Sequence, residues 1–240
     1  MTPANREQML RVLRESLSRA HLPGATPEHP PSLTYSAGRN LWSDGTDNAT
    51  LVARFRTELE ALAGFTYPVG SVDEAASQIA DLALRFSSER VLAWDAAAFD
   101  ALGVPGLIDR LTARGVELVS QQVPFNGDAR REALAALDPI PMGLTGADAG
   151  LAESGSIVLS SGPGRGRLAS LMVPIHVAVL RCDRMVFSLS DLFRLRPDLA
   201  AMPGSNLVCI TGPSRTADIE MTLSRGVHGP REVHVVLLSV

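Results

Sequence analysis

This sequence has few of the residues that hold metal clusters. Only two of its 240 residues are cysteine, and no Cys-x-x-Cys pair occurs. A four-thiolate iron–sulfur or zinc site needs more thiols than that. We therefore expect no metal ion and no iron–sulfur cluster in this chain alone, and the sequence leaves any other cofactor undetermined. Cys182 and Cys209 both stand in apolar runs, which predicts reduced, buried thiols.

Aromatic residues, long apolar runs and a strong net charge are also scarce. Aromatics make up 5% of the chain and the formal net charge is -4, which disfavours base stacking and any broad attraction to nucleic acid. No apolar run approaches the roughly 20 residues that span a bilayer. The N-terminus has neither the basic start nor the apolar core of a signal peptide. These features predict a cytoplasmic protein with no nucleic-acid partner and no membrane span.

What the chain does contain is an alternation of helix and strand patterns. Apolar spacing predicts helices at 5–20, 51–62, 72–86, 107–113, 147–152, 168–172, 190–195 and 216–222, with Ser71 or Asp73 capping the third. Strand patterns fall at 65–69, 91–94, 116–119, 142–145, 156–160, 175–181, 185–188, 207–211 and 233–238. This alternation predicts an α/β fold with a mostly parallel sheet covered on both faces.

The first 47 residues differ from the rest. Prolines and glycines crowd residues 21–47 and exclude regular structure there. We expect an N-terminal helix with a proline-rich linker over residues 1–47 and a single α/β domain over residues 48–240. Such an arm would suit exchange between the subunits of a homo-oligomer.

The most informative segment runs from Gly143 to Leu159, where glycines alternate with polar side chains and end in an apolar strand. Thr145, Asp148 and Glu153 are its candidates for chemistry. A carboxylate at a strand entrance can act as a base, a nucleophile or an anchor for a hydroxyl, so Glu153 and Asp148 are candidate catalytic residues. The alternative is that Glu153 only caps backbone amides in a turn.

The next loop combines flexible backbone with two guanidinium groups and is a candidate receptor for phosphate or carboxylate. Its candidate anion-binding residues are Gly162, Gly164, Arg165, Gly166 and Arg167. A helix starting near Leu168 would add its positive end. A solvated hairpin is the alternative. The loop lacks the Gly-Lys-Ser/Thr of a phosphate-binding P-loop and the spacing of a dinucleotide fingerprint.

A second polar segment follows the strand at 207–211 and is expected to open a helix. Its anion-binding candidates are Thr211, Gly212, Ser214 and Thr216, and His228 farther on is a possible proton carrier. The histidines at 176 and 234 fall in apolar strands, which predicts hydrogen-bonded core residues. Two such segments on one short chain suggest one composite site.

These segments together resemble the lactate-utilisation protein C family, which carries the LUD domain. The matching residues are Gly143–Asp148, Ala152–Val158, Gly162–Arg167, Val173–Pro174, Ile210–Glu220 and Gly226–Pro230. The resemblance implies the three-layer α/β/α sandwich of the NagB, ribose-5-phosphate isomerase and CoA-transferase superfamily. It also implies a role in oxidising L-lactate to pyruvate, together with partner proteins that carry iron–sulfur clusters.

The chemical step of this chain stays open, because a fold does not define a reaction. The first hypothesis is a subunit of a lactate-oxidising complex, either catalytic or accessory. The second is an independent enzyme of the same fold that acts on a sugar phosphate or a CoA thioester. The third is a non-catalytic module that binds an organic acid. All three need a ligand that is a small organic acid or carries phosphate.

Overall fold

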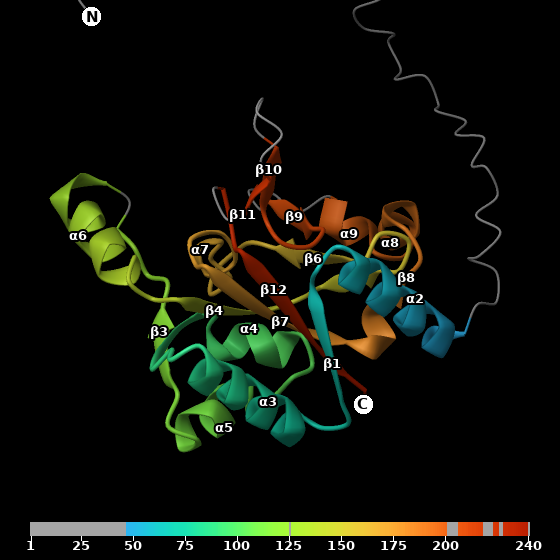
Figure 1. The fold of residues 1–240 in the computed structure, drawn as a ribbon, viewed down its shortest axis with the longest axis horizontal. Helices are drawn as coiled ribbons and strands as arrows, with labels where there is room; N and C mark the ends of the chain where they lie inside the picture. The colour runs from blue at the N-terminus through green and yellow to red at the C-terminus, as the bar shows by residue number, and fades with distance from the viewer. Residues whose placement is uncertain (1–46, 125, 201–205, 218–222, 226–227, 240) are drawn as a thin grey trace, which may run out of the picture. The chain divides into compact units, whose positions relative to one another are not determined.

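A parallel sheet forms the centre of the domain (Figure 1). The computed structural model describes residues 47–124, 126–200, 206–217, 223–225 and 228–239, which belong to one compact unit. Among these residues the main sheet has six strands in the order β1-β12-β7-β4-β2-β3, and every neighbouring pair is parallel. The strands are β1 Phe65–Val69, β2 Arg90–Ala93, β3 Glu117–Ser120, β4 Met142–Gly146, β7 Ile175–Arg181 and β12 Glu232–Leu238. The expected α/β fold with a parallel sheet is confirmed.

One face of the sheet is covered by helices. They are α3 Val72–Arg85, α4 Ala96–Ala101 and α5 Leu107–Ala113, and Figure 1 shows them together on that side. Helix α3 begins as predicted, because the Ser71 side chain accepts a hydrogen bond from the Glu74 amide at 3.1 Å. Its apolar stripe is buried against the sheet, and α5 ends at Gly115 with a left-handed φ of 84°.

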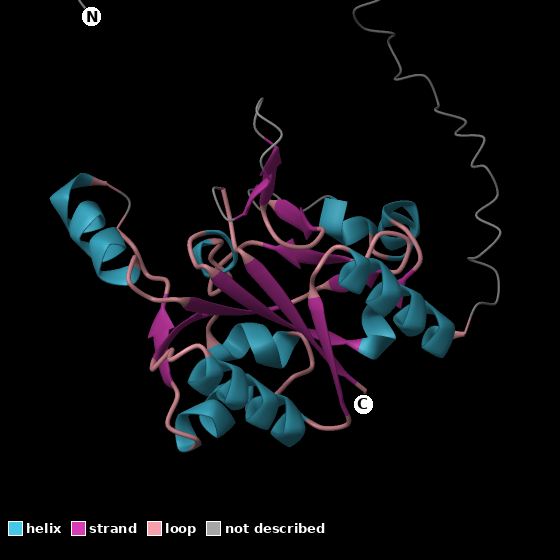
Figure 2. Ribbon diagram, in the orientation of Figure 1, coloured by secondary structure: helices cyan, strands magenta, loops and turns pink. Residues whose placement is uncertain are grey.

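The opposite face is covered by two helices and a second sheet (Figure 2). The helices are α2 Asn48–Ala61 and α7 Leu168–Leu171, and the small mixed sheet has the order β8-β5-β6-β9. Its strands are β5 Ala149–Leu151, β6 Ser156–Ser160, β8 Met185–Val186 and β9 Leu207–Ile210. Glycines allow the close approach: a Cβ at Gly143 would lie 1.9 Å from the Ala169 carbonyl oxygen of α7, and one at Gly150 would lie 2.6 Å from Leu180. The helical layer, the sheet and this mixed layer form the sandwich.

The remaining described elements lie around this sandwich. Helix α6 Gly127–Leu137 projects from it with mostly exposed side chains (Figure 1). The others are the 3₁₀ turn η1 Cys182–Arg184, helices α8 Leu189–Leu195 and α9 Pro197–Ala200, and the ribbon of β10 Arg215–Ala217 with β11 Leu223–Arg225. In the described part of the chain, no helix is long and apolar enough to cross a bilayer.

Two predicted helices are wrong. Residues 147–152 form a turn and β5, because the Asp148 amide donates to the Val158 carbonyl and small residues let this strand pack on β7. Residues 215–217 pair with 223–225 as a ribbon, so no helix starts at Thr216. Helices α4, α6 and α9 were not predicted from the sequence. The N-terminal helix at 5–20 and most of the linker lie outside the described residues.

The cysteines behave differently from each other. Cys182 is buried as expected, but Cys209 is exposed, so the prediction of a buried thiol there is wrong. Cys209 lies on β9, and β9 is the edge strand of the small sheet. A side chain on an edge strand has a neighbouring strand on one side alone, which explains its exposure.

Candidate functional site

The strand order of the main sheet reverses between β2 and β4. From β2 the chain adds β3 on one side, then crosses over to β4 and adds β7 and β12 on the other. In α/β sheets, ligands bind in the crevice that such a reversal leaves beyond the carboxyl ends of the strands. Trp94 and Asp95 follow β2 here, and Asp148 follows β4 by two residues.

The glycine–arginine loop of residues 161–167 crosses this crevice. The Gly164 carbonyl accepts from the Asp95 amide at 3.0 Å, and the Gly166 carbonyl accepts from Trp94 Nε1 at 2.9 Å. Gly164 has a left-handed φ of 70°, and a Cβ there would lie 3.1 Å from the Asp95 carboxylate. The loop needs glycine at this position because of both the conformation and the close approach.

Arg165 is held in place on three sides. Its Nη1 donates to Asp148 Oδ1 at 3.0 Å and to Ser160 Oγ at 3.1 Å, and its guanidinium lies 5.5 Å from the centre of the Trp94 ring. Asp148 also accepts from the amide and the hydroxyl of Ser160, at 2.6 and 2.8 Å. The Asp148 side chain is 5% exposed and fully engaged. It acts in this structure as an anchor that positions Arg165.

Beside this pair the carboxyl edge opens into a cavity of about 360 Å³, called here the arginine cavity. Its polar lining residues are Asp148, Ser160, Ser161, Arg165, Arg184, Arg196 and Asp198, and its other lining residues are Ala101, Leu102, Gly162, Pro163 and Leu199. Three cations and two anions therefore face one space. That charge balance favours a negatively charged ligand.

Arg184 and Arg196 were not identified from the sequence. Arg196 binds both carboxylate oxygens of Asp198, at 2.9 and 2.7 Å. Arg184 ends η1 directly after β7, and burial is the main cause that lowers the pKa of its guanidinium. Neither residue stands in a glycine-rich motif. The one available signal was that Arg184 follows a buried parallel strand, whose carboxyl end is where ligands bind.

The predicted residues around Glu153 lie elsewhere, at the hairpin tip, residues 152–156, where β5 leads into β6. The Ser156 hydroxyl is hydrogen-bonded to that of Ser154 at 2.7 Å and to that of Thr211 at 2.6 Å. The Glu153 amide donates to the Phe187 carbonyl at 2.8 Å. Its carboxylate is exposed and makes no hydrogen bond or ion pair with any described residue.

The other predicted residues belong to the second segment, which contacts the hairpin tip through Thr211. Gly212 has a φ of 83° and lies against Leu62 at the end of α2. The Ser214 amide donates to the Pro230 carbonyl at 2.8 Å, and His228 is exposed nearby in sequence. Thr216 lies in β10.

The candidates therefore form two groups at the two ends of β6. Ser156 begins that strand at the hairpin tip, and Ser160 ends it at the arginine cavity, roughly 14 Å away for an extended strand. The cavity receives Asp148, Gly162 and Arg165, with Gly164, Gly166 and Arg167 in the same loop. No residue of the hairpin tip lines the cavity. The expected single composite site is thus two separate groups.

Thr145 belongs to neither group. It is buried in β4, and its hydroxyl is hydrogen-bonded to His176 Nε2 at 2.9 Å on β7. Burial lowers the pKa of His176 to about 3, so this ring is neutral, and its Nδ1 has no partner among the described atoms. His234 is buried between Tyr67 and Glu232, bonded to them at 2.9 and 3.1 Å. Both histidines are hydrogen-bonded core residues, as predicted.

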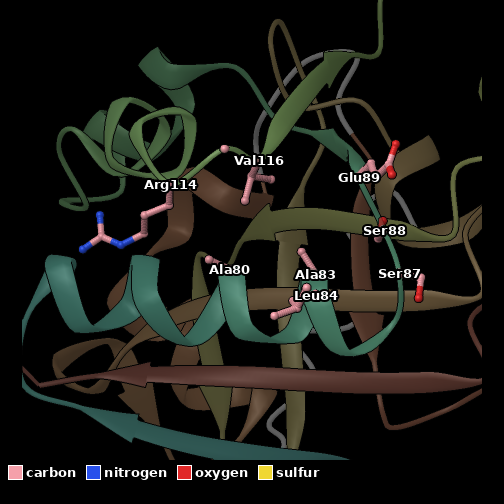
Figure 3. Close-up of a pocket in the computed structure, with 9 residues that line it drawn as sticks. Ala80, Ala83, Leu84, Ser87, Ser88, Glu89, Arg114 and Val116 are labelled. Atoms are coloured by element: carbon pink, nitrogen blue, oxygen red, sulfur yellow. The ribbon is translucent and has the colours of Figure 1, made fainter.

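A second cavity, of about 340 Å³, opens where β2 and β3 begin (Figure 3). Its walls come from Ala80, Ala83 and Leu84 of α3 and from Val116, and its one arginine is Arg114. Arg114 already binds Asp73 at 2.7 Å. Because that cation is compensated and this edge holds the amino ends of the strands, the arginine cavity is the stronger candidate site. No group of metal-binding side chains occurs among the residues described.

Fold and cavity together define an α/β protein with an arginine-lined cavity at the carboxyl edge of a parallel sheet. The chain belongs to the LUD domain family, which matches residues 52–238. It is 34% identical to Lactate utilization protein C of Halalkalibacterium halodurans over 171 residues, 69% of this chain and 70% of that protein. It is 28% identical to Lactate utilization protein C of Bacillus subtilis over 246 residues, 99% of this chain and 98% of that one.

A solved structure shares the fold. The crystal structure of a DUF162 family protein from Deinococcus radiodurans superposes with a TM-score of 0.58 at 22% identity. The match covers 80% of this chain and 98% of that chain. At this identity the likeness concerns the fold alone.

Proposed function

We propose that this protein is a subunit of an L-lactate utilisation system that acts in the cytoplasm. In this proposal it supports the oxidation of L-lactate to pyruvate together with partner proteins that hold iron–sulfur clusters. The similarity to relatives named Lactate utilization protein C supports the assignment to a lactate-utilisation system. The observation that carries a role in the chemistry is the arginine cavity, whose excess positive charge suits an organic acid anion.

The residues of the cavity would divide the work between binding and positioning. Arg184, half-buried and facing the cavity, would bind the negatively charged group of the ligand. Asp148 would hold Arg165 at a fixed place beside it. Oxidation of lactate removes two electrons and two protons, and the electrons would pass to the clusters of the partners. Glu153 and His228 remain candidates for proton transfer at the hairpin tip.

The test is growth on L-lactate as the sole carbon source after deletion of the gene. We expect growth to fail and to return with the wild-type gene, and the wild-type protein to copurify with iron–sulfur proteins from lactate-grown cells. Rescue with Arg184→Gln and with Glu153→Gln then separates the two groups. Normal growth of the deletion strain, with no second copy of the gene present, would contradict the proposal.

A second candidate function is an independent enzyme that acts on a sugar phosphate or a CoA thioester. The observation in its favour is the cavity volume of about 360 Å³, since cavities of roughly 300 Å³ or more hold ligands of drug size. L-lactate has only six non-hydrogen atoms. Thermal unfolding with a panel of sugar phosphates and acyl-CoAs tests this alternative, and no rise in the melting temperature with any of them would count against it.

A further inference from the structure

Two of the three arginines that line the arginine cavity form direct ion pairs within the protein. Arg165 is bound by Asp148 and lies over Trp94, and Arg196 is bound on two nitrogens by Asp198. Arg184 also lines the cavity, and no hydrogen bond or ion pair joins its guanidinium to any residue that the structure describes. Asp148 and Asp183 act on Arg184 only through space, so its guanidinium donors are available to a ligand in a lining of three arginines and two aspartates.

The hydroxyl groups on the wall already have partners within the protein. Ser160 Oγ donates to Asp148 at 2.8 Å. Ser161 Oγ donates to the Asn206 carbonyl at 3.1 Å and accepts from the Asn206 amide at 3.0 Å. A ligand rich in hydroxyl groups would find few free polar groups here. A site that selects hydroxyl-rich ligands has polar wall groups that stay unpaired until such a ligand binds. The hydroxyls of this wall are already paired within the protein.

The rest of the wall is apolar. It is formed by Ala101 and Leu102 at the end of α4, Pro163 of the glycine–arginine loop and Leu199 of α9. These carbon surfaces share the space with one free guanidinium. The ligand that matches this wall has one negative charge at one end and a carbon body at the other.

We propose that the arginine cavity binds a monocarboxylate with an apolar carbon body, and that Arg184 binds its carboxylate. This inference rests on the proposed function, because it takes the cavity as the ligand site, and it goes further by excluding phosphate dianions and sugar phosphates. L-lactate, with a single methyl group, is a small member of this class. Acids with a longer carbon chain fill more of the cavity and bind more tightly.

Isothermal titration calorimetry on the full-length chain tests the ligand class. The probes are L-lactate, butanoate, hexanoate, malonate and inorganic phosphate. We expect hexanoate to bind more tightly than butanoate, by about fourfold for each methylene that leaves water for the apolar wall. Malonate and phosphate are expected to bind at least tenfold more weakly than hexanoate. Equal affinities for butanoate and hexanoate, or a preference for phosphate, would overturn the assignment.

Variants test the role of Arg184. Arg184→Gln should abolish hexanoate binding, and Arg184→Lys should retain part of it because the charge remains. Arg131→Gln is the matched control, since Arg131 is 81% exposed on α6. Asp198→Asn frees Arg196 and adds a second uncompensated charge, so the cavity should then accept malonate. Unchanged binding in Arg184→Gln, with a wild-type circular dichroism spectrum and melting temperature, would rule out the role.

The outcome is separable from that of the growth test. If Arg184→Gln loses hexanoate binding and still restores growth on L-lactate, the monocarboxylate site stands and the proposed link to lactate oxidation falls. If the deletion strain fails on lactate while the purified protein prefers phosphate, the monocarboxylate assignment falls and the lactate role stands.

Discussion

In the arginine cavity the Asp148 side chain is 5% exposed and holds three hydrogen bonds, whereas at the hairpin tip the Glu153 carboxylate is exposed and holds none with described residues. Both carboxylates come from one continuous glycine-rich segment, so their sequence context is nearly the same. Their structural contexts differ because β5 lies between them and places them at opposite ends of the β5–β6 hairpin. A buried carboxylate with all its acceptors used is suited to positioning, and an exposed one with free acceptors is suited to proton transfer.

The largest expected effect comes from removing the buried carboxylate. Asp148→Ala leaves the Arg165 guanidinium and the Ser160 amide without their acceptor, and breaking a buried ion pair from one side costs about 3–5 kcal/mol. Urea unfolding followed by circular dichroism measures the loss. Asp198→Ala is the control, because that pair is exposed to solvent and its loss should cost far less. A loss no larger than that of the control would show that Asp148 does not anchor the loop.

The next largest loss of stability is expected when a glycine in either region is replaced by alanine. Gly155 at the hairpin tip has a φ of 65°, and an added Cβ would lie 2.4 Å from the Leu59 amide nitrogen of α2. A clash of this kind costs about 1–3 kcal/mol and the left-handed conformation about 1–2 kcal/mol, so Gly155→Ala should lose about 2–5 kcal/mol. At Gly164 the nearest atom is a side-chain oxygen 3.1 Å away, and Gly164→Ala should lose less. Chemical denaturation of both variants measures the two losses in unfolding free energy. A larger loss in Gly164→Ala than in Gly155→Ala would contradict this prediction.

The buried, neutral His176 of the core predicts a pH effect. Its folded pKa is about 3 against an ordinary 6.5, so the unfolded chain binds a proton that the folded chain does not. Stability should therefore fall as pH drops from about 6.5 toward 3, with a slope approaching 1.4 kcal/mol per pH unit from this residue. His234, whose pKa burial also lowers, contributes in the same direction. Unfolding free energies of wild type and His176→Gln at pH 7, 6 and 5 measure this pH dependence. Equal slopes in the two proteins would show that His176 is not its source.

Sequence periodicity was sufficient for much of the fold because it reflects local burial. The strand at 65–69 and the helix at 107–113 have the predicted bounds, since their apolar spacing and flanking glycines act within a few residues. The glycine-rich segment at 147–152 was mispredicted, because its strand depends on contact with Leu180 of β7. Arg184 was missed for the same kind of reason. Its place in the cavity depends on the crossover that brings the end of β7 beside Asp148, and the one local signal is that it directly follows a buried parallel strand.

The smallest expected effect on stability is also the most informative about function. Glu153→Gln removes a charge from an exposed side chain that has no partner among the described residues, so the free energy of unfolding should change by about 0.5 kcal/mol or less. Ser156→Ala is the contrasting variant at the same tip, because it breaks two hydroxyl hydrogen bonds and should cost about 1–2 kcal/mol. If Glu153→Gln is as stable as wild type and fails to restore growth on L-lactate, the loss is chemical and the tip takes part in the reaction. If it restores growth fully, the hairpin tip is structural and the chemistry belongs to the arginine cavity.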